Sequence, residues 1–86
     1  MSFETVQNFY ERRVYERLTI LGRKRPELDE ETLADAACLA LNRLPPRYVR
    51  HVVDAEFFLS IDDMEEIDRR VNEAVDAALV IVTQER

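Results

Sequence analysis

The stretch Leu41-Asn42-Arg43-Leu44-Pro45-Pro46-Arg47-Tyr48-Val49 decides how this chain folds. An apolar pattern with helical spacing runs into it and is stopped by the two prolines. Pro45 has no backbone N–H, and each proline moves the residue before it out of the helical region. The chain must therefore leave the helix as a stiff extended segment, which we call the diproline elbow (residues 44–47).

Positive charge surrounds this elbow. No carboxylate occurs between Asp35 and Asp54, and the same interval contains Arg43, Arg47, Tyr48, Arg50 and His51. Guanidinium groups bind phosphate in a bidentate manner, and Arg and Tyr side chains stack on purine faces. Two interpretations stay open: a preformed anion site, or a proline-stopped helix followed by charged residues that face solvent.

The length and net charge of the chain limit its domain count and its possible partners. Eighty-six residues indicate one domain spanning residues 1–86, and the formal net charge of -6 argues against nonspecific nucleic-acid binding and against an anionic membrane surface. A local cluster can still bind a small anion. The absence of a long apolar run predicts no membrane insertion, and the N-terminus does not resemble a signal peptide. We expect a cytoplasmic location.

Apolar spacing predicts two helices before the elbow. The first runs from about Ser2, its N-cap, to Leu21, with Gly22 at the C-cap position. The basic triplet 23–25 that follows suits the negative end of the helix dipole. The second helix runs from about Glu30 to Arg43, with Asp29 as its N-cap. Small residues on its apolar face let another helix approach closely; they are Ala36, Ala37 and Ala40.

After the elbow, residues 48–53 and 55–59 are predicted to be extended, either as a small hairpin or as simple extended packing. A last helix begins at Ser60, with Asp63 as capping-box partner. Its end, residues 77–82, is apolar nearly all round, so a partner subunit or the first helix should cover it. The fold class is mainly α, with three to four helices and a short extended or hairpin segment after the elbow.

The sequence gives little support for a metal site or for a catalytic site. His51 is the one histidine and Cys38 the one cysteine, too few ligands for structural zinc, and the single cysteine forms no disulfide within the chain. Cys38 is expected to be a small apolar core residue. Gly22 is the one glycine, so no glycine-rich phosphate loop exists. We expect no enzyme activity, no metal and no cofactor.

Two blocks of sequence resemble the late competence development protein family ComFB. The first is Asn8-Phe9-Tyr10-Glu11-Arg12-Arg13-Val14-Tyr15-Glu16, and the second is Asp35-Ala36-Ala37-Cys38-Leu39-Ala40-Leu41-Asn42-Arg43-Leu44-Pro45-Pro46-Arg47-Tyr48-Val49. Together with the terminal helix, these blocks cover nearly the whole chain. The second block is long and fairly specific.

The resemblance implies a small, mainly helical homodimer that binds a cyclic dinucleotide second messenger, with links to competence, pili and motility. Cyclic di-GMP is the expected ligand ahead of cyclic di-AMP, and a downstream protein effector is implied. The matching positions are Asn42, Arg47 and Tyr48 in the second block and Asn8, Tyr10 and Glu11 in the first. Together with Arg43 and Arg50, these are the candidate ligand-binding residues.

Roles follow from the chemistry of these side chains. Arg43, Arg47 and Arg50 would neutralise phosphate, and Tyr48 would stack on a base. Asn42 either contacts a base or caps the second helix. Many family members have cysteines before the second block in a pattern that suggests zinc, but here those places hold residues such as Asp29 and Thr32, so no metal is inferred. The alternative function is a ligand-free adaptor that dimerises and docks an acidic partner segment.

Overall fold

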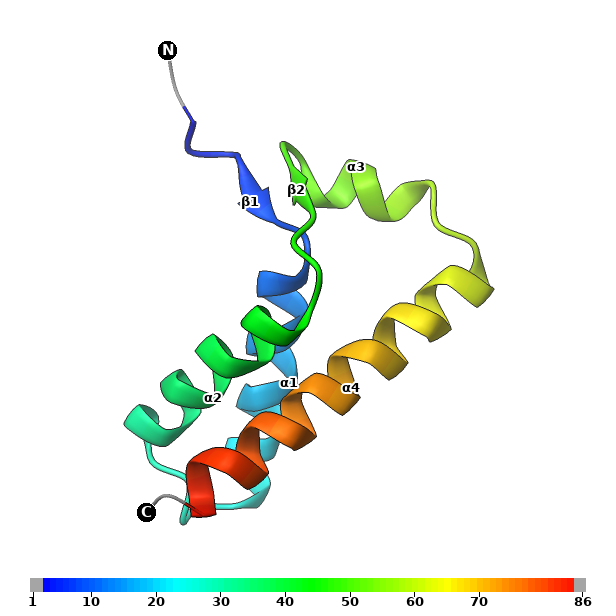
Figure 1. The fold of residues 1–86 in the computed structure, drawn as a ribbon. Helices are drawn as coiled ribbons and strands as arrows, with labels where there is room; N and C mark the ends of the chain where they lie inside the picture. The colour runs from blue at the N-terminus through cyan, green and yellow to red at the C-terminus, as the bar shows by residue number, and fades with distance from the viewer. Residues whose placement is uncertain (1–2, 85–86) are drawn as a thin grey trace.

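The computed structural model describes residues 3–84 as a mainly helical fold with one small sheet (Figure 1). Its elements in chain order are β1 (Gln7–Asn8), α1 (Tyr10–Lys24), α2 (Glu30–Arg43), β2 (Tyr48–Val49), α3 (Val52–Phe57) and α4 (Ile61–Gln84). The fold class predicted from the sequence is confirmed, including an extended segment directly after the elbow.

The three long helices share one core. α4 makes its most extensive contact with α2, and α1 packs against both (Figure 1). Ala36 and Ala40 on α2 are fully buried, as is Val75 on α4. Their small side chains let the two helices approach closely, as the sequence indicated. Further core residues from α1 and α4 are Val14, Leu18, Val71, Ala78, Leu79 and Val82.

The boundaries of α2 and the start of α4 follow local signals. The Asp29 carboxylate accepts a hydrogen bond from the Thr32 N–H at 2.8 Å, and the chain becomes extended at Leu44, directly before the prolines. At α4, the Ser60 hydroxyl accepts from the Asp63 N–H at 3.0 Å, and the Asp63 carboxylate accepts from the Ser60 N–H at 3.1 Å. This reciprocal pair is the predicted capping box.

The first helix begins later than predicted. α1 starts at Tyr10, and the residues before it include β1, which pairs antiparallel with β2 through Gln7–Val49 and Asn8–Tyr48. Phe3 and Val6 had suggested an earlier start by their spacing, but both are exposed. A helix over these residues would therefore bury neither side chain, and strand pairing with β2 sets the backbone conformation before α1. The predicted N-cap Ser2 lies outside the described residues.

Gly22 does not cap α1, since the helix continues to Lys24 and the Arg25 N–H bonds the Leu21 carbonyl at 2.9 Å. The glycine instead marks a close approach between α1 and α2. A Cβ at this position would lie 2.9 Å from Leu33 Cδ1, closer than two carbons can pack. The missing side chain therefore lets Leu33 sit against the backbone of α1.

The region after β2 corrects a second expectation. Residues 52–57 form α3, so the expected extended run over 55–59 is wrong, and the expected run over 48–53 is extended only at its start. β2 takes β1 as its strand partner, so no strand is left to pair with the segment that follows. Its backbone groups bond locally instead, as in the Ala55 N–H to His51 carbonyl bond at 3.0 Å. Arg13 of α1 then links this region to α4, 3.9 Å from Glu56 and 3.0 Å from Asp68.

The apolar end of α4 is covered within the chain. Ala78, Leu79 and Val82 are buried, and α4 as a whole contacts α2 more extensively than α1. Val80 and Ile81 face outward. The argument for a partner subunit at this stretch therefore loses its main basis. Within residues 3–84, no helix is both long and apolar enough to cross a bilayer.

Replacing Gly22 by Val should destabilise the fold, because the new side chain meets Leu33. The nearest atom is the tip of the Leu33 side chain, which can move partly aside, so the loss should lie at the lower end of the usual overpacking range, about 1 kcal/mol. The matched control is Arg23→Val, which adds the same side chain at an exposed neighbouring position. Urea unfolding followed by circular dichroism measures both. Equal stability of the two variants would contradict the close approach of α1 and α2.

Candidate functional site

One side chain fixes the elbow against the start of α1. Asn8 is 7% exposed, and its Oδ1 accepts hydrogen bonds from the N–H groups of Tyr10 and Arg47, both at 3.2 Å. The Phe9 N–H donates to the Arg47 carbonyl at 2.6 Å. The backbone at Arg47 is therefore held on both its donor and its acceptor side.

The side chain of Arg47 is also held. Its guanidinium carbon lies 4.9 Å from the centroid of the Phe9 ring, and Phe9 is fully buried. A cation at this distance over an aromatic face is attracted by the ring's quadrupole. Arg13 lies over the same ring at 5.3 Å. Phe9 thus positions Arg47 at the elbow and Arg13 beside α4.

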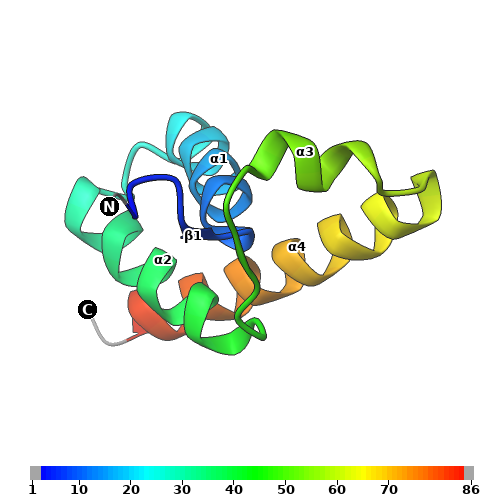
Figure 2. The ribbon, with the colours of Figure 1, turned by 90° about the horizontal axis from the view of Figure 1, so that it is seen from above.

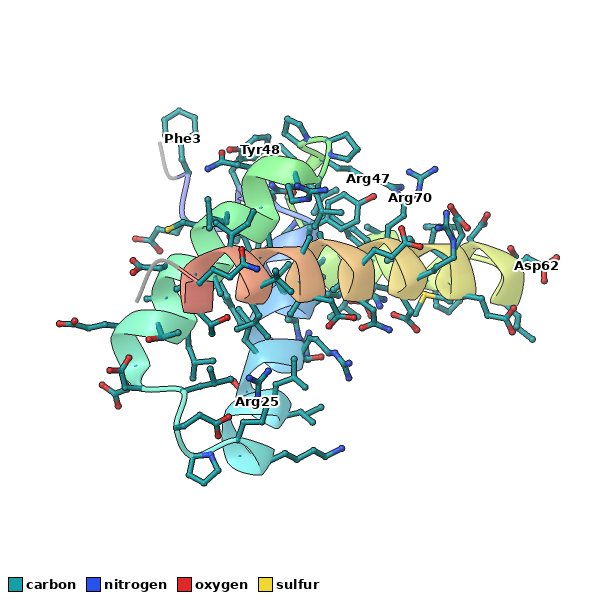
Figure 3. The ribbon with its side chains drawn as sticks, turned by 60° about the horizontal axis from the view of Figure 1, so that its bottom comes forward. Phe3, Arg25, Arg47, Tyr48, Asp62 and Arg70 are labelled. Carbon is teal, nitrogen blue, oxygen red and sulfur yellow. The ribbon has the colours of Figure 1, made fainter. Side chains whose placement is uncertain are left out.

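Beyond Arg47, two adjoining hollows run along α4. The first, about 290 Å³, is lined by Tyr10, Arg47, Leu59, Asp63, Glu66, Ile67 and Arg70. The second, about 270 Å³, is lined by Arg43, Leu44, Pro45, Arg70, Glu73 and Ala74. Arg70 belongs to both, so we call the two hollows together the elbow site. Figure 3 shows Arg47 and Arg70 next to each other, with Tyr48 apart from them.

Carboxylates in the elbow site are largely paired with arginine. Arg69 binds Glu66 through two nitrogens, at 2.5 and 3.0 Å, and Glu73 at 2.7 Å, while Arg70 Nε donates to Glu66 at 3.0 Å. Hydrogen bonds from Arg69 and Arg70 lower the pKa of Glu66 to about 2, so this carboxylate is charged at neutral pH. Among the described residues, neither Arg43 nor Arg47 forms an ion pair.

Asp63 also faces the elbow site. The Ser60 backbone N–H and then the Ser60 side chain lower the pKa of Asp63, and the Arg47 charge adds to this effect. The Glu66 hydrogen bond raises the pKa of Arg70, with a lesser contribution from Tyr10. Three arginines (Arg43, Arg47, Arg70) therefore meet three carboxylates (Asp63, Glu66, Glu73) in the lining of the two hollows, and Arg69, outside the lining, pairs with Glu66 and Glu73. The lining is balanced in charge, in a chain whose net charge is -6.

The structure brings together three of the predicted site residues: Tyr10, Arg43 and Arg47. Tyr10 contributes to the wall of the hollow although it is almost fully buried. Arg70 was not predicted. Nothing in the sequence ties it to the elbow, because its position depends on how α4 lies across the end of α2.

Arg50 is not in the elbow site. It lines a separate hollow with Arg12 and His51, so the expectation of one pocket for Arg43, Arg47 and Arg50 is wrong within a single chain. The reason is the turn at His51, where β2 ends and α3 begins. Tyr48 is 68% exposed, since successive side chains of an extended segment point to opposite sides.

The remaining predicted residues lie elsewhere. Asn42 is exposed in the last turn of α2, whose C-cap is Leu44. Glu11 is half-buried on α1, and its charge adds to the effect of burial in raising the pKa of Tyr15.

Cys38 is exposed, which corrects the expectation of a core cysteine. It lines an apolar groove between α1 and α2, and in residues 3–84 no group of three or more metal-ligating side chains is placed to hold a metal.

Together these features define a small helical domain with an arginine-lined site beside a rigid diproline elbow. The family model of the late competence development protein ComFB matches residues 7–86, essentially the whole chain, so this chain belongs to the ComFB family. Membership links it to competence. Neither a curated protein nor a solved structure matches the chain.

Replacing Asn8 by Ala should destabilise the fold by about 2 kcal/mol, because two backbone N–H groups lose their acceptor in a largely buried place. Asn8→Asp keeps an oxygen at that position and a negative charge at the start of α1, so it should lose less. Thermal unfolding of both variants measures the difference. An Asn8→Ala protein as stable as the parent would show that the bridge does not hold the elbow.

Proposed function

We propose that this protein is a cytoplasmic, non-enzymatic, homodimeric receptor for a cyclic dinucleotide, with cyclic di-GMP favoured over cyclic di-AMP. The observation that supports it most is the arrangement of Arg43, Arg47 and Arg70 around a rigid elbow in an acidic chain. ComFB family membership supports the same proposal.

A cyclic dinucleotide has two phosphates, and the elbow site offers them guanidinium groups. Arg43 and Arg47 have no ion-pair partner among residues 3–84, so binding a phosphate breaks no existing pair at either residue. Arg47 is also preorganised by Phe9, which lowers the entropy lost on binding. These two residues are the first phosphate ligands in the proposal.

Carboxylates beside the site compete with the ligand for Arg70. Arg69 bridges Glu66 and Glu73, and Arg70 shares Glu66, so these two arginines balance these two carboxylates. A doubly charged ligand can therefore compete for Arg70 at the cost of one contact to Glu66. Asp63 stays engaged with Ser60.

Bases would bind outside the two hollows. Tyr48 presents an exposed ring directly after Arg47, which is the place where a base can stack while its phosphate binds the elbow. Asn42 is exposed one turn before the elbow and can donate to and accept from a base edge. Asn8 acts through the geometry of the elbow, because its side chain is nearly buried and its oxygen is engaged. Arg50 and Glu11 are not needed by a ligand centred on the elbow site.

Arg47→Ala should weaken binding of cyclic di-GMP by roughly tenfold to a hundredfold, the usual loss for one charge-assisted contact. Arg23→Ala is the matched control, because it removes the same charge from an exposed position at the end of α1. Isothermal titration with cyclic di-GMP and cyclic di-AMP measures both variants beside the parent.

Absence of heat with both nucleotides at tens of micromolar protein would end the receptor proposal. Binding of an acidic peptide in the same titration, abolished by Arg47→Ala while neither nucleotide binds, would favour the adaptor function instead.

Arg70→Ala should also weaken nucleotide binding, and Glu66→Gln should strengthen it, because removing the Glu66 charge releases Arg70 for the ligand. Glu65→Gln is the control for Glu66→Gln: it removes the same charge from the adjacent, exposed residue, which does not line the elbow site. Equal affinities of the Glu65→Gln and Glu66→Gln proteins would exclude competition between Glu66 and the ligand for Arg70.

A further inference from the structure

One aromatic ring holds two arginines, of which one is ion-paired and the other is not. The guanidinium carbon of Arg47 lies 4.9 Å from the centroid of the Phe9 ring, and that of Arg13 lies 5.3 Å from it. Arg13 forms ion pairs with Asp68 at 3.0 Å and with Glu56 at 3.9 Å, whereas Arg47 forms none within residues 3–84. An unpaired cation of the elbow site and a paired cation of α1 therefore share one ring.

Arg13 joins three helices. It belongs to α1, its partner Glu56 lies on α3, and its partner Asp68 lies on α4. The Met64 sulfur on α4 also accepts a hydrogen bond from Arg13 at 3.3 Å. The Arg13 side chain is only 13% exposed, and salt screens such enclosed charges weakly. The strength of its ion pairs therefore depends on other charges close by.

α3 is attached to the rest of the fold at few points. It has six residues and lies apart from the α1–α2 pair (Figure 2). Val52 is buried at its start, and Glu56 ties it to Arg13. Leu59, just after α3, lines the same hollow as Arg47. The chain therefore leaves the elbow site at Arg47 and returns to it at Leu59, with β2 and α3 in between.

From this arrangement we propose that Arg13 is a positioning residue that couples anion binding at Arg47 to the placement of α3. Two cations beside one ring repel each other and compete for its negative face. An anion bound to Arg47 cancels one of these charges, so Phe9 and Glu56 hold Arg13 more firmly and α3 becomes better ordered. The inference rests on the proposed function only for the identity of the anion.

The segment that responds also presents an apolar surface. Phe57 at the end of α3 and Phe58 after it are 83% and 82% exposed, the most exposed aromatic side chains among residues 3–84. An anion at the elbow site therefore changes the order of this surface. Because linkage is reciprocal, any contact that fixes α3 raises the affinity of the elbow site for the anion.

Removing the Arg47 charge tests the coupling without a ligand. The Ala55 N–H bonds the His51 carbonyl at 3.0 Å within α3. In Arg47→Gln its hydrogen exchange should be roughly twofold to fivefold slower than in the parent, the effect of one exposed cation–π contact. Arg43→Gln is the matched control: it removes an unpaired charge that lines the other hollow of the elbow site, and it should leave the exchange rate unchanged. Hydrogen-exchange NMR measures all three proteins.

Two further variants separate the coupling from a merely structural role of Arg13. In Arg13→Gln and in Glu56→Gln, α3 should exchange faster than in the parent, and adding Arg47→Gln should no longer slow it, because the link is broken. An Arg13 that only stabilises the fold would leave the effect of Arg47→Gln intact in both backgrounds, which would overturn the inference. An exchange rate in Arg47→Gln equal to that of the parent would overturn it as well.

Cyclic di-GMP supplies the arm that depends on the proposed function. At saturation it should slow α3 exchange in the parent and in Arg12→Gln, which loses an exposed α1 charge paired with Glu16, but not in Arg13→Gln. Nucleotide binding that leaves α3 exchange in the parent unchanged would overturn the coupling and leave the receptor function intact. Slowed exchange in Arg47→Gln without any nucleotide binding to the parent would end the receptor function and support the coupling.

Discussion

The geometry of this protein depends on one amide oxygen. Asn8 Oδ1 binds the first N–H of α1 and the N–H of Arg47, which joins two parts of the chain that are far apart in sequence. The prolines make the elbow stiff, but stiffness alone does not say where it points. The Asn8 bridge and the Phe9 N–H fix that direction, and Phe9 then holds the Arg47 side chain. Every inference about the elbow site depends on this placement.

The chain uses its charges in separate regions. Around the elbow, arginines match the carboxylates in number, and Arg69 pairs with Glu66 and Glu73, which would otherwise oppose a bound anion. Along α3 and the start of α4 carboxylates predominate. The formal net charge hides this division, because a site responds to the charges within a few ångströms. One molecule can therefore be acidic as a whole and still present unpaired arginines, Arg43 and Arg47, at the elbow within the described residues.

Local signals made much of the fold predictable. Asp29, the Ser60–Asp63 pair and the two prolines act within three or four residues of themselves, and α2 and the start of α4 followed from them. The failures involve contacts between distant residues. The start of α1 depends on strand pairing with β2, and Gly22 serves contact with Leu33. α3 forms because β1 occupies the partner position that a hairpin would have used.

The candidate site likewise contains residues that the sequence could indicate and a residue that only the packing brings there. Arg43 and Arg47 could be found because the diproline signal and the carboxylate-free interval mark them in one short stretch. Arg70 could not, because only the packing of α4 against α2 brings it to the elbow. Arg50 was included for its nearness in sequence, and the turn at His51 places it in another hollow.

The most direct test of this account is the NMR spectrum of the arginine Nε–Hε groups during titration with cyclic di-GMP. Binding at the elbow site predicts that the signals of Arg43, Arg47 and Arg70 shift together and saturate at one ligand concentration, while that of Arg23 stays in place. Shifts confined to Arg12 and Arg50, or no shift in the three elbow arginines, would contradict it.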